Sequence, residues 1–153
     1  MLRAVERALG PDLSSLVTHL LPFAQQMLRR YGEFYPFGAT MDVNGAIAAT
    51  GAYSSSDDHS ESQRVLDLLI EGMALDAQAG RIRAAGACVD VHTIPAGETT
   101  GRDAICLKLA RVNGEALDVY VPYSRRWLRG VHYDDAYSMA GTLTLGCLET
   151  HES

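Results

Sequence analysis

The 153-residue chain lacks an excess of positive charge, because 13 lysine and arginine residues are outnumbered by 19 aspartate and glutamate residues. The formal net charge of −6 argues against a general nucleic-acid binder or a protein of anionic membranes. No run approaches the roughly 20 apolar residues of a membrane span, and charges stand where a signal peptide has its apolar core. These absences predict a soluble domain in the cytoplasm that binds neither nucleic acid nor membrane.

Cysteine and catalytic motifs are also scarce. Cys88, Cys106 and Cys147 have no CxxC spacing and cannot all pair with one another, which predicts reduced thiols. The chain has no glycine-rich phosphate loop, no G-x-S-x-G sequence and no H-E-x-x-H sequence. We therefore expect no cofactor and no metal, and we favour a protein that is not an enzyme.

The length and the 47% hydrophobic content predict one globular domain over residues 1–153. Apolar residues spaced by three and four predict a helix from about residue 12 to Tyr31, kinked or restarted at Pro22, and a second helix over 60–79. Alternating residues predict strands over 81–94, 104–112, 116–123 and 142–148, with an irregular segment over 124–141.

Two Asn-Gly pairs, Asn44-Gly45 and Asn113-Gly114, predict hairpins with type I′ turns. Small residues on the second arm of the first hairpin, including Ala48 and Ala49, predict that a helix packs closely on that arm. The expected fold class is α+β, with a single antiparallel sheet of about five or six strands and helices packed mainly on one face.

Two polar clusters have ordinary structural explanations. Cys88, Asp90 and His92 alternate on one strand face, but the first and last would lie about 13–14 Å apart, too far for a hydrogen bond. A polar outer face is the favoured interpretation, and Cys106 is expected on that same face while Cys147 points inward. The cluster formed by Asp57, Asp58 and His59 precedes a helix and is explained by capping.

The segment SRRWLRGVHYDDAY over residues 124–137 carries the strongest functional pattern. Its candidate ligand- or partner-binding residues combine positive charge with aromatic rings: Arg125, Arg126, Trp127, Arg129, His132 and Tyr133. Arginine beside aromatic residues suits recognition of carboxylates, phosphates or a protein partner. The alternative is a surface loop whose arginines pair with Asp134 and Asp135.

Three hypotheses of function follow. The first is a non-enzymatic interaction or regulatory module with an unidentified protein partner or a second copy of itself. The second is a small enzyme or anionic-ligand-binding protein with a pocket near 124–137, walled by Phe34, Tyr35 and Phe37. The third is a bacterial protein that confers immunity to a toxin, which a neighbouring toxin gene would indicate.

The segment GEFYPFGATMDVNG is similar to a family of small bacterial proteins in which a helix ends in such a run and is followed by a hairpin, a helix and a meander. The resemblance covers roughly residues 20–123 and implies fold and origin, with no established activity. The order of two strands, a helix and three strands also resembles the profilin-like and roadblock-like architecture.

Overall fold

The computed structural model describes residues 2–51, 61–94, 97–126 and 128–145. A short helix α1 (Arg3–Glu6) and a long helix α2 (Pro11–Tyr31) precede the hairpin β1 (Phe37–Asp42) and β2 (Ile47–Thr50). Helix α3 (Glu61–Gln78) then leads to five strands, which are β3 (Ile82–Thr93), β4 (Arg102–Arg111), β5 (Ala116–Arg126), β6 (Gly130–Tyr133) and β7 (Tyr137–Ala140). No helix in the described residues is long and apolar enough to cross a membrane.

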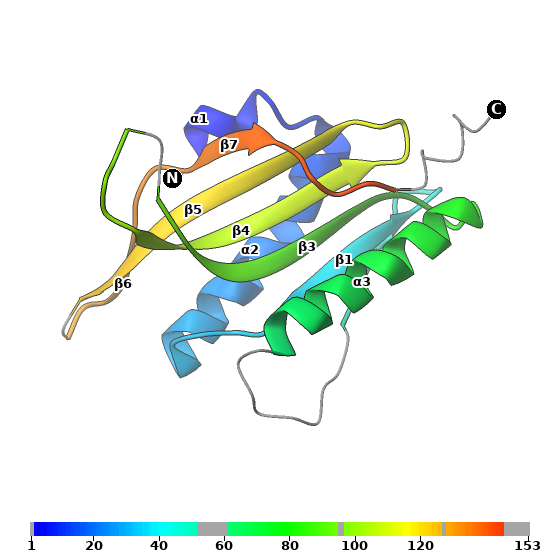
Figure 1. The fold of residues 1–153 in the computed structure, drawn as a ribbon. Coiled ribbons are helices and arrows are strands. Elements are labelled where there is room, and N and C mark those ends of the chain that lie inside the picture. The colour runs from blue at the N-terminus through cyan, green and yellow to red at the C-terminus, as the bar shows by residue number, and fades with distance from the viewer. Residues whose placement is uncertain (1, 52–60, 95–96, 127, 146–153) are drawn as a thin grey trace.

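All strands join one antiparallel sheet in the order β2-β1-β3-β4-β5-β6, and β7 pairs with β5 beside β6 (Figure 1). The expected α+β class with a single antiparallel sheet is therefore confirmed. The strands β3, β4 and β5 form a meander, whereas β1 reaches β3 only after the chain has passed through α3.

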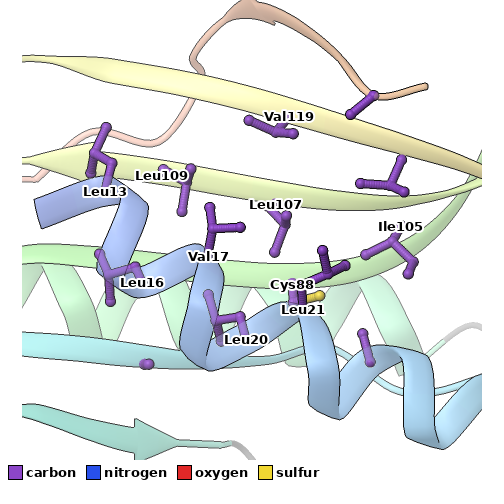
Figure 2. Close-up of a cluster of buried hydrophobic side chains, with 14 of the residues drawn as sticks. Leu13, Leu16, Val17, Leu20, Leu21, Cys88, Ile105, Leu107, Leu109 and Val119 are labelled. Atoms are coloured by element: carbon purple, nitrogen blue, oxygen red, sulfur yellow. The ribbon is translucent and has the colours of Figure 1, made fainter. Parts of the chain in front are cut away.

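The two long helices lie on opposite faces of the sheet, so the structure divides the helices more evenly than the sequence pattern indicated (Figure 1). Helix α2 packs on the face that carries the alternating residues Ile105, Leu107 and Leu109 of β4 (Figure 2). Helix α3 packs with Leu66 and Met73 on the other face, against Ala85, Ala87 and Ala110. Each face thus has its own hydrophobic core.

Small residues in the centre of the sheet let both helices approach. A Cβ atom placed on Gly86 would lie 2.9 Å from side-chain atoms of Leu20 and Leu109, on the α2 face. A Cβ atom on Gly38 would lie 2.6 Å from both the Gly86 carbonyl oxygen and Met73 Cε, on the α3 face. The expected contact of a helix with the alanines of β2 is wrong, because Ala48 and Ala49 on this edge strand are exposed.

Both Asn-Gly pairs do form hairpin turns, but the expected type I′ geometry is wrong. Only the glycines have positive φ, 93° at Gly45 and 99° at Gly114. The Gly45 N–H donates to the Asp42 carbonyl at 3.0 Å, and Gly114 N–H donates to Arg111 at 3.1 Å. Each connection is therefore a type I turn followed by a glycine in the left-handed region.

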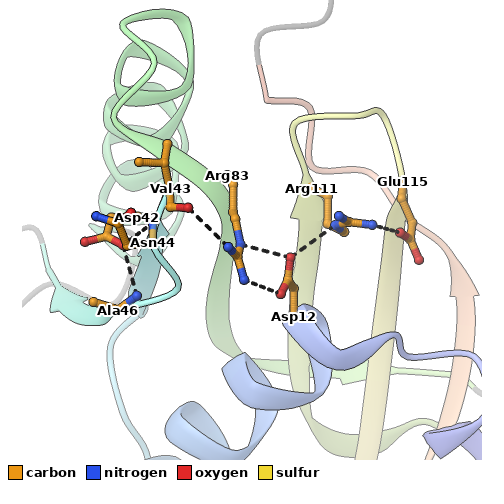
Figure 3. A network of polar contacts seen from close by, with 8 residues as sticks. All are labelled: Asp12, Asp42, Val43, Asn44, Ala46, Arg83, Arg111 and Glu115. Carbon is orange, nitrogen blue, oxygen red and sulfur yellow. Dashed lines mark hydrogen bonds and ion pairs between the residues drawn. The ribbon is translucent and has the colours of Figure 1, made fainter.

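Helix α2 is one continuous helix that includes Pro22, so the alternative of a restart at that residue is wrong. An ionic clamp fixes its N-terminal end to the sheet (Figure 3). Asp12 accepts two hydrogen bonds from the guanidinium of Arg83, at 2.9 and 3.2 Å, and lies 3.4 Å from Arg111 Nε. Arg83 also donates to the Val43 carbonyl, which ties the first hairpin to the same point. The negative charge stands in the first turn, where the helix dipole favours it.

The C-terminal third differs most from the sequence pattern. The supposedly irregular segment over 124–141 contains the end of β5 and the strands β6 and β7. A strand over 142–148 is wrong for residues 142–145, because β6 and β7 already pair with the outer edge of β5. Leu143 and Leu145 nevertheless point inward and pack in the core beneath α3. Cys147 lies outside the described residues.

A buried polar network holds this C-terminal segment on the sheet. Asp118 is only 2% exposed, and it accepts hydrogen bonds from the Thr142 N–H at 3.3 Å and the Thr142 hydroxyl at 3.1 Å. Lys108, the only lysine in the chain, donates to Asp118 Oδ2 at 3.3 Å and to Thr142 Oγ1 at 2.9 Å. Hydrogen bonds to Asp118 and Lys108 therefore hold the segment after β7 on the sheet, in addition to the packing of Leu143 and Leu145.

Candidate functional site

A groove opens between the last turn of α2 and the hairpin formed by β5 and β6. We call it the hairpin groove. It has a volume of about 450 Å³ and is lined by Leu28, Arg29, Tyr31, Gly32, Arg125, Arg126, Leu128, Gly130 and Val131. In Figure 1 the β5–β6 hairpin extends past the other strands beside the end of α2. Three arginine residues and several apolar residues therefore contribute to one concave surface.

Local backbone geometry positions this groove. Gly32 ends α2 with φ of 80°, and its N–H donates to the Leu28 carbonyl at 2.9 Å. The guanidinium of Arg125 lies directly over this glycine, because a Cβ atom there would meet Arg125 Nη1 at 2.7 Å. A helix C-terminus carries partial negative charge, which favours a cation at this position. Gly32 thus provides both the helix end and the space for Arg125.

The predicted arginines stand on paired strand backbone. Arg125 is opposite Val131 and Arg126 is opposite Gly130 in the ladder of β5 and β6. Arg129 is exposed in the turn, where its N–H donates to the Arg126 carbonyl at 3.0 Å. Trp127 lies outside the described residues. The hairpin therefore holds Arg125 and Arg126 by its register, as the irregular segment expected here would not.

Two further predicted residues lie away from the groove lining. His132 Nε2 is 3.2 Å from Asp134 Oδ1, and Asp134 also pairs with Arg102. Tyr133 packs against the α2 core at 6.4 Å from the ring of Tyr123. The expected pairing of Asp134 with an arginine is thus present, but the arginine comes from β4.

Two of the aromatic residues proposed as a pocket wall, Phe34 and Phe37, pack edge-on against each other, with their ring centroids 5.7 Å apart. Phe34 is buried in the α2 core, and Tyr35 is 44% exposed. Phe37 packs edge-on against Phe23 at 4.9 Å and lines a separate pocket of about 350 Å³ with His19. Among the described pocket linings, these rings and the arginines do not share one pocket.

The sequence pattern did not identify Arg29, Tyr31 and Leu128 as groove residues. Arg29 and Tyr31 belong to the last turn of α2, and only the long-range packing of α2 beside β6 brings them near Arg125. Leu128 is recognised as unusual only in the structure, where it has a positive φ of 67° and is 89% exposed.

Charge pairing separates the groove arginines from those on the sheet. Arg83, Arg102 and Arg111 each form an ion pair with an aspartate or glutamate. Arg29, Arg125 and Arg126 take no part in these ion pairs, although the charge of Arg125 lowers the pKa of Asp90. These three exposed guanidinium groups can therefore bind an external anion.

The polar face that carries Asp90 and His92 forms two separate pairs. Tyr123 donates a 2.6 Å hydrogen bond to Asp90, and His92 Nδ1 lies 3.0 Å from Asp103. Burial raises the pKa of Asp90, while the Tyr123 hydrogen bond and the charge of Arg125 lower it. Burial and the bond to Asp90 raise the pKa of Tyr123. Cys88 lies on the same strand face as Asp90 and is buried in the α2 core.

We expect the Asp90→Asn substitution to change how stability depends on pH. Because the folded protein raises the pKa of Asp90, its favourable contribution is complete below the unfolded pKa of about 3.9 and is lost as pH rises through the folded pKa. Asparagine keeps an acceptor for Tyr123 and does not ionise. The variant should therefore gain stability relative to the wild type between pH 3 and pH 7 in urea unfolding. An unchanged difference across this range would contradict the assignment.

The expected surface position of two cysteines is wrong. Cys88 is opposite Leu107 and Cys106 is opposite Tyr120, so the two thiols lie on different faces of the sheet. Both are free and buried. For Cys88 the error arose because α2 covers the face that the polar residues Asp90 and His92 indicated as external, whereas Cys106 is buried on the other face.

We therefore expect Cys88 and Cys106 to be unreactive in the native protein. Burial raises the pKa of the Cys88 thiol well above its usual value and raises that of Cys106 to about 11, so neither forms thiolate near pH 8. In a Cys147→Ser variant, a thiol reagent should label neither site without denaturant and both after unfolding. Rapid native labelling of either cysteine would contradict its placement.

The described residues contain no cluster of three or more histidine, cysteine, aspartate or glutamate side chains that could hold a metal ion. Asp57, Asp58 and His59 lie outside the described residues. No protein-family model, no curated protein and no solved structure matches the chain. The assignment of a function therefore rests on the residues of the chain itself.

Proposed function

We propose that the chain is a non-enzymatic interaction module that binds a protein partner at the hairpin groove. The observation that supports this function best is the set of exposed arginines, Arg29, Arg125 and Arg126, which line one groove together with exposed apolar residues. Arginine is enriched in the parts of interfaces that contribute most to binding. The buried, unpaired thiols support a reducing compartment such as the cytoplasm.

Charge reversal in the groove tests this function. The partner is first captured with the wild-type chain, then purified and shown to bind the wild type again. We expect the Arg125→Glu/Arg126→Glu variant to lose binding to this purified partner. Loss of two such contacts should weaken binding by about 100-fold. The measurement is titration calorimetry with the purified partner, and light scattering shows whether that partner is a second copy of the chain.

Arg3→Glu/Arg7→Glu is the matched control, because it changes the net charge by the same amount as the groove variant. Arg3 and Arg7 precede the N-terminal end of α2, whereas the groove is at the C-terminal end of this helix, which is about 30 Å long. This control should bind as the wild type does. Equal binding by both reversed variants would place the interface elsewhere and overturn the proposal. If the wild type captures no partner that binds it again after purification, the proposal that the chain is an interaction module is wrong.

A further inference from the structure

We infer that the occupant of the hairpin groove is an acidic peptide segment that also carries an apolar side chain. This inference rests on the function proposed above and specifies the chemistry of the partner. The groove gathers positive charge in a protein whose formal net charge is −6. Two of its arginines occupy neighbouring positions on β5, and the third comes from the last turn of α2.

The charged part of the ligand follows from the guanidinium groups. A guanidinium presents a planar set of N–H donors that matches the two oxygens of a carboxylate. Arg125 is held over Gly32 and cannot approach α2 more closely without displacing that glycine. A ligand in the groove would use the N–H groups of Arg125 that do not face Gly32. Aspartate and glutamate side chains of a partner provide carboxylates with this geometry.

The apolar part follows from Tyr31 and Leu128. Tyr31 is 65% exposed and Leu128 is 89% exposed, and both line the same groove as the arginines. Leu128 also has φ of 67°, in the left-handed region where a side chain costs roughly 1–2 kcal/mol relative to glycine. An exposed leucine in a strained backbone conformation destabilises the folded protein locally. Binding of an apolar side chain of the partner to Leu128 would explain why a leucine occupies this position.

The same features disfavour nucleic acid as the occupant. A long polyanion would be repelled by the negative charge of the remaining surface, whereas a short acidic segment contacts only the local arginines. The sugar–phosphate backbone also has no aliphatic side chain that could pack between Leu128 and Val131 as leucine could. The groove volume of about 450 Å³ is in the range of sites that accommodate a few side chains.

Fluorescence anisotropy of the full chain with labelled 12-residue peptides tests this inference. One peptide alternates glutamate with leucine, a second replaces leucine with serine, and a third replaces glutamate with lysine. We expect the first to bind at least about tenfold more tightly than either of the others, and to weaken as salt rises from 50 to 500 mM. Inorganic phosphate and a single-stranded oligonucleotide serve as competitors and should not displace it at equal concentration.

Two variants separate recognition from folding. Arg125→Glu/Arg126→Glu should lose at least about tenfold in peptide affinity, and Arg3→Glu/Arg7→Glu should lose none. Leu128→Gly removes the apolar side chain and relieves the positive φ. It should bind the peptide several-fold more weakly while its melting temperature is equal or higher. A purely structural role for Leu128 predicts unchanged affinity.

The outcomes distinguish the two proposals. If groove reversal abolishes binding of the purified partner but no acidic peptide binds, the peptide chemistry is wrong and the interaction surface stands. If the oligonucleotide or phosphate displaces the peptide, the groove is a general anion site and the inference is overturned. If the serine peptide binds as tightly as the leucine peptide, the apolar requirement is wrong.

Discussion

We expect the Asp118→Ala substitution to lower the free energy of unfolding by about 3 kcal/mol. Asp118 is 2% exposed and neutralises Lys108, whose side chain is 18% exposed. Removing the carboxylate leaves the ammonium group partly buried without a counter-charge, and Thr142 loses the acceptor for its N–H and its hydroxyl. Urea unfolding followed by circular dichroism measures the loss.

A double substitution gives the control for this prediction. Lys108→Met/Asp118→Leu removes both charges together and should recover most of the lost stability, because two apolar side chains of similar size can replace a buried ion pair. The contrast with the single variant isolates the unpaired charge from the change in packing. A loss below about 1 kcal/mol for Asp118→Ala would show that the pair behaves as an exposed surface pair.

The Gly38→Ala substitution should destabilise the protein by about 2 kcal/mol, although a glycine within a strand is ordinarily unfavourable relative to alanine. The added methyl group would lie 2.6 Å from the Gly86 carbonyl oxygen on β3 and 2.6 Å from Met73 Cε on α3. Methionine can move, but the carbonyl belongs to the adjacent strand. The strands β1 and β3 must therefore separate locally.

Gly72→Ala is the matched control. Gly72 lies within α3, and a Cβ atom there would have no neighbour within 4 Å. The same chemical change should therefore stabilise the protein by about 0.5–1 kcal/mol, because alanine has the higher helix propensity. Opposite signs for the two variants in one denaturation series would confirm that contact across the sheet determines the effect. Equal stability of Gly38→Ala and the wild type would show that β1 can shift.

Local sequence patterns predicted much of the fold because they report local physics. The alternation of Ile105, Leu107 and Leu109 gave the correct inward face, and Asn44-Gly45 gave the correct hairpin. The same patterns could not show that a second helix covers the opposite face. Cys88 was misplaced for another reason: it faces the α2 core, although Asp90 and His92 on the same strand face indicated an exposed surface. Likewise, the alternating leucines after residue 141 predicted a strand, although no free sheet edge remained beside β5 for them to join.

The sequence predicted only part of the candidate site, because local patterns do not show which distant segments pack together. Arg125 and Arg126 are conspicuous in sequence and do line the groove. Arg29 and Tyr31 precede them by about 95 residues and join them only through the packing of α2 beside β6. Phe34 and Phe37 lie close to the helix end in sequence, but Phe34 is buried in the α2 core and Phe37 begins β1, where its ring packs on Phe23 and Phe34.

The strand order has a consequence for the folding kinetics. The pairs of β3, β4 and β5 join neighbours in sequence, whereas the pair of β1 with β3 closes a loop that contains β2 and α3. Closing a longer loop costs more chain entropy, which favours formation of the meander first and docking of β1 afterwards. Substitution at Gly38 should accordingly act mainly on the unfolding rate. The first hairpin would then be the last part of the sheet to form and the first to detach.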